Sequence, residues 1–260
     1  MPRESGAFPY LRAVVVSSGA QTNDDSMNER HDSSEASQRA FFGRRKGHPL
    51  RTRQVALFDS LLPKLAPDLS KPAPADLRTL FDGPLDQMRL EIGFGGAEHL
   101  IGQALANPRS GFIASDAFVN AIGKALVAID DHKLSNIRLH FGDASELLDW
   151  LPAGTLTRID LLYPDPWPKR RHWKRRFVQD DSLKRLARIL KSGGELRFAT
   201  DIADYAAWTL ARVLRSADFV WTAEQAADWR KPWPDFAGTR YGAKAKREGR
   251  APAYFIFRRV

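Results

Sequence analysis

The chain has 260 residues, of which 43% are hydrophobic and 27% are charged, and these proportions are typical of an ordinary globular protein. Its formal net charge of +9 favours an anionic partner. The absence of cysteine excludes disulfides, thiolate metal sites and cysteine nucleophiles, and no apolar run approaches the length that a membrane span requires.

The N-terminal region differs in composition from the rest of the chain. Residues 1–40 are rich in Ser, Asn, Asp, Gln and Glu without an apolar period, so we predict that they are disordered. Met27 lies within this stretch and is an alternative start of translation. Residues 41–75 are predicted to form a basic arm and a lead-in helix, and the arm is either a solvated tail or a segment that folds against RNA. We place the main domain at 76–260.

From residue 88 onwards, short apolar runs alternate with amphipathic stretches. The predicted strands are 88–94, 111–115, 137–141, 158–163, 195–200, 219–222 and 254–258. The predicted helices are 97–106, 118–132, 144–151, 180–190 and 203–216. A glycine pair, Gly193 and Gly194, is expected to stop the fourth of these helices. The alternation predicts an α/β fold with a doubly wound, mostly parallel sheet of seven strands, in which ligands bind at the carboxyl ends of the strands.

A glycine-rich turn follows the first predicted strand, in Leu90-Glu-Ile-Gly-Phe-Gly-Gly-Ala-Glu98. Gly93 and Gly95 permit a tight turn and let a ligand approach the backbone closely. A dinucleotide fingerprint would place glycine at position 98, and the glutamate found there would repel a pyrophosphate at a helix N-terminus. The turn therefore suits a ligand without phosphates and disfavours a nicotinamide-dependent dehydrogenase.

Three acids follow three successive predicted strands. S-adenosylmethionine carries a sulfonium and an amino group, which an acid such as Glu91 complements. Asp116 is placed to accept hydrogen bonds from ribose hydroxyls, and Asp143 could face the adenine amine. The alternative is a glycine turn with incidental surface acids.

The most informative segment is residues 162–176, which follow the fourth predicted strand. Three prolines within 164–168 make the backbone a stiff loop. This loop holds a single carboxylate, Asp165, beside the indole of Trp167, and six Lys or Arg follow within residues 169–176. A rigid acid and an aromatic ring beside dense positive charge are what is needed to hold a base while gripping phosphates. The segment predicts chemistry on a nucleic acid.

Over roughly residues 41–260, the sequence resembles the bacterial tRNA (guanine-N7)-methyltransferases. The segments that carry the resemblance are Glu91-Ile-Gly-Phe-Gly95, Pro164-Asp-Pro-Trp-Pro-Lys169, the basic run to Arg176, Leu190-Lys-Ser-Gly-Gly194, Ala199-Thr-Asp201 and Thr239-Arg-Tyr241. The resemblance implies a Rossmann-like class I methyltransferase fold with an antiparallel last strand. It also implies S-adenosylmethionine as methyl donor, a guanosine in the tRNA variable loop as acceptor, and a cytoplasmic location. We expect no metal and no membrane partner.

The resemblance assigns roles to individual positions. Those that match the family's cofactor-binding residues are Glu91, Gly93, Gly95, Asp116, Asp143 and Asp165. Asp165 also matches the residue assigned as catalytic. The positions that match substrate contacts are Lys169, Asp201, Thr239, Arg240 and Tyr241. The positions in the region assigned to RNA contact are Arg170, Arg171, Lys174, Arg175 and Arg176.

Some of these roles have structural alternatives, and three positions depart from the family pattern. Asp201 could instead be the N-cap of the helix that follows it, and the basic run could be a solvated helix face. The family usually has glutamate in place of Asp116 and often a third glycine in place of Ala97. Its Thr-Lys-Phe-Glu segment reads Thr-Arg-Tyr-Gly here, so the carboxylate is lost at Gly242.

Guanine N7 has an in-plane lone pair and no proton, so methyl transfer to it requires positioning rather than a base. We hypothesise that Asp165 accepts hydrogen bonds from the guanine N1–H and exocyclic amine, which would hold N7 towards the methyl group. Two other functions stay open. An adenine amino-methyltransferase would normally carry two adjacent prolines after its leading polar residue, whereas Asp165 lies between prolines. The other is a protein that binds tRNA and cofactor with weak or no turnover.

Overall fold

The computed structural model describes residues 47–260, which belong to one unit of the chain, Phe41–Val260. The predictions for residues 1–40, for Met27 and for most of the basic arm lie outside the described residues. The strands are β1 (Gln87–Ile92), β2 (Ser110–Asp116), β3 (Ile137–Phe141), β4 (Leu156–Leu162), β5 (Leu190–Thr200), β6 (Phe219–Trp221) and β7 (Ala253–Arg259). The α-helices are α2 (Thr52–Ser60), α3 (Leu62–Leu65), α4 (Glu98–Ala106), α5 (Val119–His132), α6 (Ala144–Trp150), α7 (Asp180–Ile189), α8 (Ala203–Val213), α9 (Ala227–Arg230) and α10 (Arg240–Arg247). Two 3-10 helices are η1 (Leu77–Leu80) and η2 (Arg170–Arg175).

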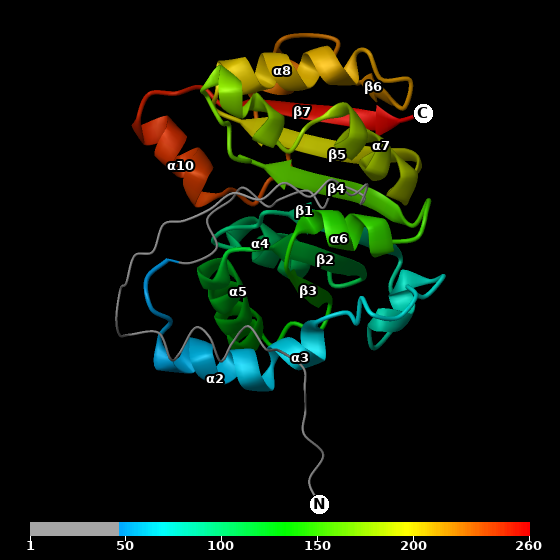
Figure 1. The fold of residues 1–260 in the computed structure, drawn as a ribbon, viewed down its shortest axis with the longest axis vertical. Coiled ribbons are helices and arrows are strands. Elements are labelled where there is room, and N and C mark those ends of the chain that lie inside the picture. The colour runs from blue at the N-terminus through cyan, green and yellow to red at the C-terminus, as the bar shows by residue number, and fades with distance from the viewer. Residues whose placement is uncertain (1–46) are drawn as a thin grey trace, which may run out of the picture. The chain divides into compact units, whose positions relative to one another are not determined.

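The strands form one seven-stranded sheet in the order β3-β2-β1-β4-β5-β7-β6 (Figure 1). Strand β7 runs antiparallel to both of its neighbours, and the other pairs are parallel. The predicted doubly wound, mostly parallel sheet with an antiparallel last strand is therefore confirmed. The strand order reverses between β1 and β4, and in open α/β sheets such a switch point places the ligand site at the carboxyl ends of the strands.

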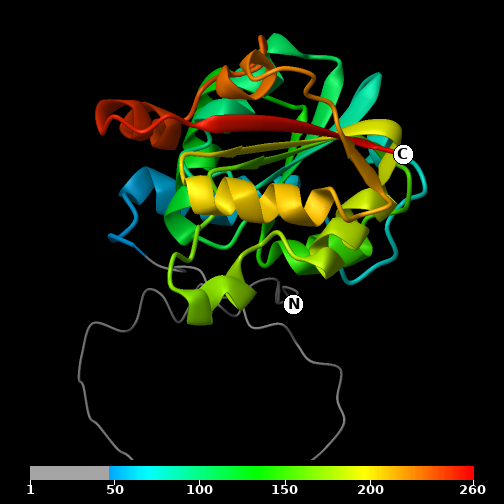
Figure 2. The same ribbon diagram turned by 90° about the horizontal axis from the view of Figure 1, so that it is seen from above.

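One face of the sheet is apolar. Because side chains alternate along a strand, Leu90, Ile159 and Phe198 point to the same side. They join a core to which α6, α7 and α8 contribute buried residues, among them Leu147 and Leu186. Figure 2 shows α8 along one side of β7, with α9 on the opposite side.

The opposite face carries charged side chains in the middle of the sheet. Arg89 and Glu91 on β1 lie beside Arg158 and Asp160 on β4, and Arg197 on β5 is the next neighbour of Asp160. Arg89, Glu91, Arg158 and Asp160 are all buried. Buried charges are costly unless they are paired, so the residues that cover this face must supply partners of opposite charge as well as fit its shape.

The sequence predicted that Gly193 and Gly194 stop a helix, but in the structure they lie within β5. Helix α7 already ends at Ile189, and the buried Leu190 begins β5 by pairing with Leu156 of β4. The register then jumps to Glu195 opposite Arg158, so the residues between form a bulge. Gly193, with φ of 75°, supplies the backbone conformation that this bulge needs.

Helix α2 lies within the region predicted to hold a lead-in helix. It packs on α5 through Arg53, whose Nη2 is 2.6 Å from a carboxylate oxygen of both Asp130 and Asp131. Just before α2, the carbonyl oxygen of His48 accepts a hydrogen bond from the Asn120 side chain. The lead-in region is thus attached to the first half of the sheet.

Candidate functional site

The glycine turn after β1 is held by Asp116 at the end of β2. Gly95 N–H donates to Asp116 Oδ2 at 2.9 Å, and Phe118 N–H donates to Oδ1 at 2.8 Å. Burial raises the pKa of Asp116, although these donors and the nearby Arg240 favour its charged form. Gly93 has φ of 71° and no neighbouring atom within 4 Å of where a Cβ would stand. The backbone of the turn is therefore open to a ligand.

Ala97 stands in the left-handed conformation, with φ of 67°, directly before α4. This conformation costs a residue with a Cβ roughly 1–2 kcal/mol more than glycine. A glycine at this position, which the resemblance to the family implies, would adopt this φ without that cost.

Glu91 forms a buried pair with His99, the second residue of α4. Glu91 Oε2 and His99 Nδ1 are 2.9 Å apart, and the two side chains are 5% and 1% exposed. Burial lowers the pKa of His99, but the Glu91 carboxylate more than offsets this, so the net shift is upward. The sequence predicted a cofactor role for Glu91 and none for His99, because nothing in the spacing marks the pair.

Asp143, also predicted to bind the cofactor, is the N-cap of α6. Its Oδ1 accepts a hydrogen bond from Ser145 N–H at 2.8 Å. The capping bond engages one of the two carboxylate oxygens and holds the side chain at the carboxyl end of β3.

Asp165 lies in the loop of residues 164–168, called the proline loop below. Its side chain is exposed and has no hydrogen-bond or ion-pair partner among residues 47–260. The surrounding protein nevertheless raises the pKa of its carboxyl, because it is partly desolvated. Its charge also raises the pKa of the Asp116 carboxyl. An aspartate without a counter-ion among the described residues is a ready acceptor for a ligand's hydrogen-bond donors.

Arg176, one of the residues predicted to contact RNA, is buried in this structure. Its side chain is 0% exposed and pairs with Asp204 of α8. Its Nε donates to the Pro166 carbonyl oxygen at 2.8 Å, and its guanidinium lies 5.0 Å from the Trp173 ring centroid and 4.8 Å from that of Trp208. Arg176 therefore fixes the proline loop onto α8.

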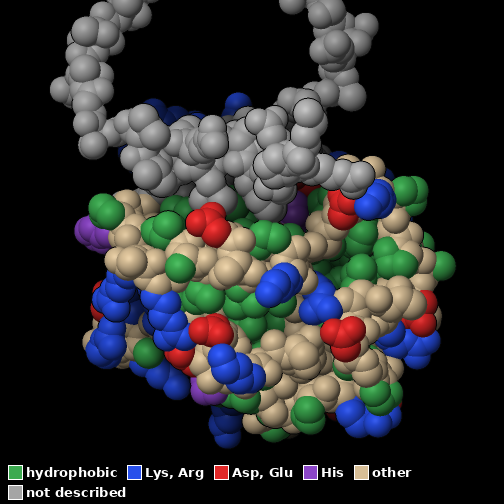
Figure 3. Space-filling model, turned by 90° about the horizontal axis from the view of Figure 1, so that it is seen from below, with side chains coloured by type: hydrophobic (Ala, Val, Ile, Leu, Met, Phe, Trp, Pro, Cys, Tyr) green, Lys and Arg blue, Asp and Glu red, His purple; other side chains and the backbone are tan. Residues whose placement is uncertain are grey.

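The other basic residues of the run form or flank η2. Lys169, Arg170, Arg171 and Lys174 are exposed, whereas the Arg175 guanidinium lies 5.0 Å from the ring centroid of Trp167. On the face seen in Figure 3, Lys and Arg side chains are interspersed with Asp and Glu. The run is thus a concentration of exposed positive charge directly after Asp165.

Asp201 is not the N-cap of α8, which was its structural alternative. The N-cap residue is Ile202, whose N–H donates to Thr200 Oγ1 at 3.3 Å. Asp201 Oδ2 instead accepts from Arg250 Nε at 2.6 Å. In this arrangement Asp201 is engaged with the segment before β7.

The segment predicted to bind substrate opens α10 and lies against the glycine turn. Thr239 is the N-cap, and its Oγ1 accepts from Gly242 N–H at 3.0 Å. A Cβ placed on Gly95 would be 3.5 Å from Tyr241 Cε2 and 3.8 Å from Arg240 Nη2. Gly95 and Tyr241, which are 146 residues apart in the sequence, thus meet at one edge of the sheet.

Gly242, where the family pattern has glutamate, is buried beside Tyr163. A Cβ at this position would be 2.8 Å from Tyr163 Oη, which lies 3.3 Å from Tyr254 Oη. Contacts below 3 Å require a shift of the neighbour. The space that a larger side chain would need is therefore occupied by the Tyr163 hydroxyl.

The structure brings some of the predicted site residues together and engages others elsewhere. Gly95, Asp116, Arg240 and Tyr241 meet at the carboxyl edge of the sheet, and Asp165 lies at the same edge in the loop that follows β4. These residues fit S-adenosylmethionine, which is rich in hydrogen-bond donors. The open glycine backbone allows the ligand to approach closely, and the two partly desolvated carboxyls can accept its hydrogen bonds. Glu91 and Asp201 already have partners, and Arg176 is buried.

Within residues 47–260, no group of three or more His, Asp or Glu side chains could hold a metal ion. In the same part of the chain, no helix combines the length and apolar character needed to cross a membrane.

Comparison with known proteins identifies close sequence relatives. The family model Methyltransf_4, which describes a methyltransferase family, matches residues 86–254. A tRNA (guanine-N(7)-)-methyltransferase of Nitrobacter hamburgensis is 57% identical over 236 residues, which cover 91% of this chain and 91% of that protein. The protein of the same name from Rhodopseudomonas palustris strain BisB5 is 59% identical, with 86% and 87% covered. The one from Bradyrhizobium diazoefficiens is 56% identical, with 86% and 94% covered.

Similarity to solved structures is lower. TrmN from Thermus thermophilus has a TM-score of 0.49 and 19% identity, over 70% of this chain and 47% of that chain. The family assignment therefore rests on the sequence relatives.

Proposed function

Since this chain belongs to the tRNA (guanine-N7)-methyltransferase family, we propose that it transfers a methyl group from S-adenosylmethionine to N7 of a guanosine in tRNA. We place that guanosine in the variable loop and the reaction in the cytoplasm. The observation that supports the chemistry most directly is Asp165, a carboxylate with no partner among residues 47–260, in a stiff loop followed by a cluster of exposed cations.

The cofactor would be held at the glycine turn. The open backbone at Gly93 allows close approach, and Asp116 and Asp143 offer carboxylate oxygens at the ends of β2 and β3. Tyr241 and Arg240 border the turn from α10 and would limit the access of water from that side. When bound there, S-adenosylmethionine supplies an electrophilic methyl group.

Asp165 would orient the guanine. Its two oxygens would accept from the N1–H and the exocyclic amine, a donor pair that guanine has and adenine lacks. This selects the base and fixes the direction of N7. The same charge would offset the positive charge that the ring acquires. An electrostatic contribution of this kind is stronger in a partly desolvated site than in bulk water.

The exposed cations of η2 would bind the tRNA backbone. Lys169 precedes the first residue of this helix and lies four residues after Asp165, so a phosphate bound by it would lie close to the base being modified. Arg170, Arg171 and Lys174 extend the same surface. Contacts of this kind position the nucleic acid without reading its sequence.

The decisive experiment incubates the protein with unmodified tRNA and labelled S-adenosylmethionine and analyses the digested nucleosides by mass spectrometry. We expect N7-methylguanosine. N6-methyladenosine would instead identify an adenine amino-methyltransferase. Binding of tRNA and cofactor without any methylated nucleoside would identify a protein with no turnover, which Gly242 gives a specific reason to test.

A further inference from the structure

A second proline-containing segment, Lys231–Gly238, joins α9 to the N-cap of α10 and is called the strap below. It crosses the charged face of the sheet. Trp233 of the strap is buried, with its ring centroid 5.6 Å from that of Tyr254 on β7. The ring centroid of Phe236 lies 5.4 Å from that of Tyr254 and 5.4 Å from that of His99 on α4.

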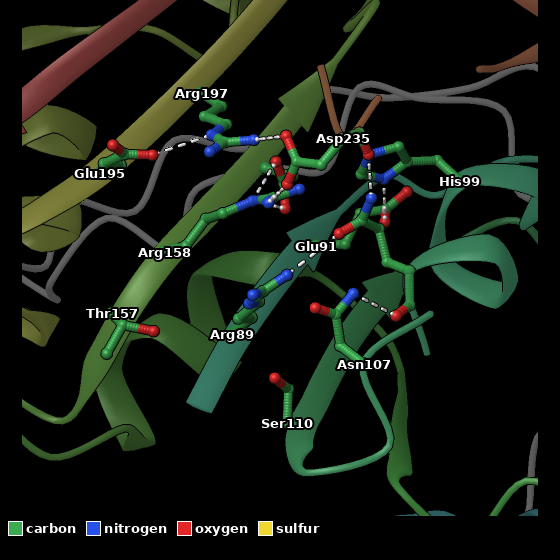
Figure 4. Close-up of polar contacts among 12 residues, drawn as sticks. Arg89, Glu91, His99, Asn107, Ser110, Thr157, Arg158, Glu195, Arg197 and Asp235 are labelled. Carbon is green, nitrogen blue, oxygen red and sulfur yellow. Dashed lines mark hydrogen bonds and ion pairs between the residues drawn. The ribbon is translucent and has the colours of Figure 1, made fainter. Parts of the chain in front are cut away.

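The strap is attached to the sheet by one carboxylate, that of Asp235. Its Oδ2 lies 2.6 Å from Arg158 Nη1, and its Oδ1 lies 2.6 Å from Arg197 Nη1 (Figure 4). Each arginine also pairs through Nε with an acid of its own strand, Asp160 or Glu195. Gln103 of α4 donates to the backbone carbonyl of Asp235. The strap is therefore bonded to β4, β5 and α4 through a single residue.

Charge balance explains why an acid stands at this position. The charged face holds three arginines, of which Arg89 has, within the described part of the chain, only the amide oxygen of Gln103 as a hydrogen-bond acceptor. Two acids of the sheet, Asp160 and Glu195, pair with these arginines, because Glu91 on the same face pairs with His99 instead. Asp235 supplies the third. Although burial raises the pKa of Asp235, the guanidinium groups of Arg197 and Arg158 hold it below its usual value.

The position of Asp235 affects the proposed site because Thr239 follows only four residues later. Four residues span at most about 14 Å, so anchoring Asp235 limits where α10 can begin. Arg240 and Tyr241, at the start of α10, are the residues that lie against Gly95. Phe236 meanwhile contacts His99, the partner of Glu91.

We propose that Asp235 is a positioning residue for methyl transfer, which it serves by bridging Arg158 and Arg197 so that Arg240 and Tyr241 stay closed over the glycine turn. This inference rests on the proposed function for the identity of the reaction. Without the bridge, the closed arrangement is only partly populated, and the apparent affinity for the cofactor falls by that fraction. Saturating cofactor restores the closed state, so kcat changes little.

The test compares Asp235→Asn with the wild-type protein and with Glu224→Gln, an exposed acid before α9 that serves as control. We expect the Asn variant to bind S-adenosylhomocysteine about 10-fold more weakly and to raise the KM for S-adenosylmethionine by a similar factor. Its kcat should stay within about 3-fold. Amide exchange at Gly242, whose N–H is bonded to Thr239, should be faster without any ligand. The control should match the wild type.

The double variant Asp235→Asn with Arg197→Gln separates positioning from stability. It restores charge balance on the face, so its melting temperature should recover towards that of the wild type. Because the strap remains unattached, binding of S-adenosylhomocysteine should stay weak. Recovery of binding together with stability would overturn the proposal, as would unchanged binding in the single variant. Failure of the wild type to methylate tRNA would contradict the proposed function alone, because the binding and exchange measurements do not depend on turnover.

Discussion

Two segments with nearly the same composition use their aspartates in opposite ways. The proline loop contains Pro-Asp-Pro-Trp-Pro, and the strap contains Pro-Trp-Pro-Asp. Asp165 in the loop has no partner within residues 47–260, and partial desolvation raises its pKa. Asp235 in the strap bridges two arginines that hold its pKa low. Prolines make both backbones stiff, but the charges that each aspartate meets decide whether it is available to a ligand.

The two segments also differ in how they are attached to the rest of the protein. The proline loop is held through a backbone carbonyl, that of Pro166, by the buried Arg176. The strap is held to the sheet through the side-chain carboxylate of Asp235, and the Asp235 carbonyl oxygen adds a hydrogen bond from Gln103 of α4. Because the proline loop is anchored by a carbonyl, the Asp165 carboxylate is available to a ligand, whereas the Asp235 carboxylate is already engaged with two arginines. The following predictions test this difference, beginning with the largest expected effect on stability or affinity.

Replacing the anchor of the proline loop should destabilise the protein strongly. Arg176→Ala leaves the Pro166 carbonyl and Asp204 without their partner and opens a cavity between Trp173 and Trp208. We expect the free energy of unfolding to fall by about 2–4 kcal/mol in urea titrations. Arg171→Ala, at an exposed position of the same run, should change it by less than about 0.5 kcal/mol. Equal effects would contradict the distinction between the two arginines.

Neutralising the exposed cations should weaken tRNA binding without affecting the fold. For the triple variant of Arg170, Arg171 and Lys174 to Ala, the slope of log affinity against log salt should become shallower by about 2–3. Binding of S-adenosylhomocysteine should not change. The slope is measured by filter binding or anisotropy at several salt concentrations, and an unchanged slope would remove η2 from the RNA-binding surface.

A side chain at Gly242 should disturb the contact between Tyr163, which precedes the proline loop, and α10, which follows the strap. Gly242→Ala places a Cβ 2.8 Å from Tyr163 Oη, and we expect a loss of about 1–3 kcal/mol in the free energy of unfolding. Adding Tyr163→Phe removes that oxygen, so the next atom is Cζ at 3.3 Å. Part of the stability should return in thermal denaturation. No recovery would place the clash elsewhere.

The two aspartates should give opposite, smaller changes in the pH dependence of stability. The folded-state pKa of Asp165 is raised, so its carboxylate destabilises the fold once the pH exceeds the unfolded value of about 4. Asp165→Asn should therefore raise the melting temperature at neutral pH and have no effect at about pH 3. The pKa of Asp235 is lowered, so its contribution is present above about pH 4 and is lost as the pH falls through the folded value.

Asp235→Asn should accordingly lower the melting temperature at neutral pH, and the difference should shrink in acid. Calorimetry measures the melting temperatures of both variants between about pH 3 and neutral pH. Changes of the same sign in the two variants would show that their surroundings do not differ as described.

The sequence was sufficient to predict the features of the fold and site that depend on local patterns. Apolar periodicity predicted all seven strands, and the glycine turn and the proline loop lie at strand ends as expected. Local patterns did not distinguish Arg176 from Arg171, because both occur in one basic run and only the contact of Arg176 with α8 separates them. The start of β5 at Leu190 was hidden by the glycine pair, which serves a bulge.

Contacts between distant residues were the other features that the sequence did not predict. Asp235 is 77 residues from Arg158 and 38 from Arg197. Asp201 finds Arg250 49 residues away, so a helix cap was the nearer alternative. Such pairs depend on which segments the sheet brings together, and this information lies in the topology rather than in any one stretch of sequence.

The central claim is that Asp165 takes part in methyl transfer, whereas Asp235 only places other groups. The direct test measures kcat for N7-methylguanosine formation in Asp165→Asn and Asp235→Asn, with both substrates saturating. We predict that Asp165→Asn lowers kcat by at least about 100-fold, because the guanine is no longer held in line. Asp235→Asn should remain within about 3-fold of the wild type. A near-normal kcat for Asp165→Asn would contradict this account.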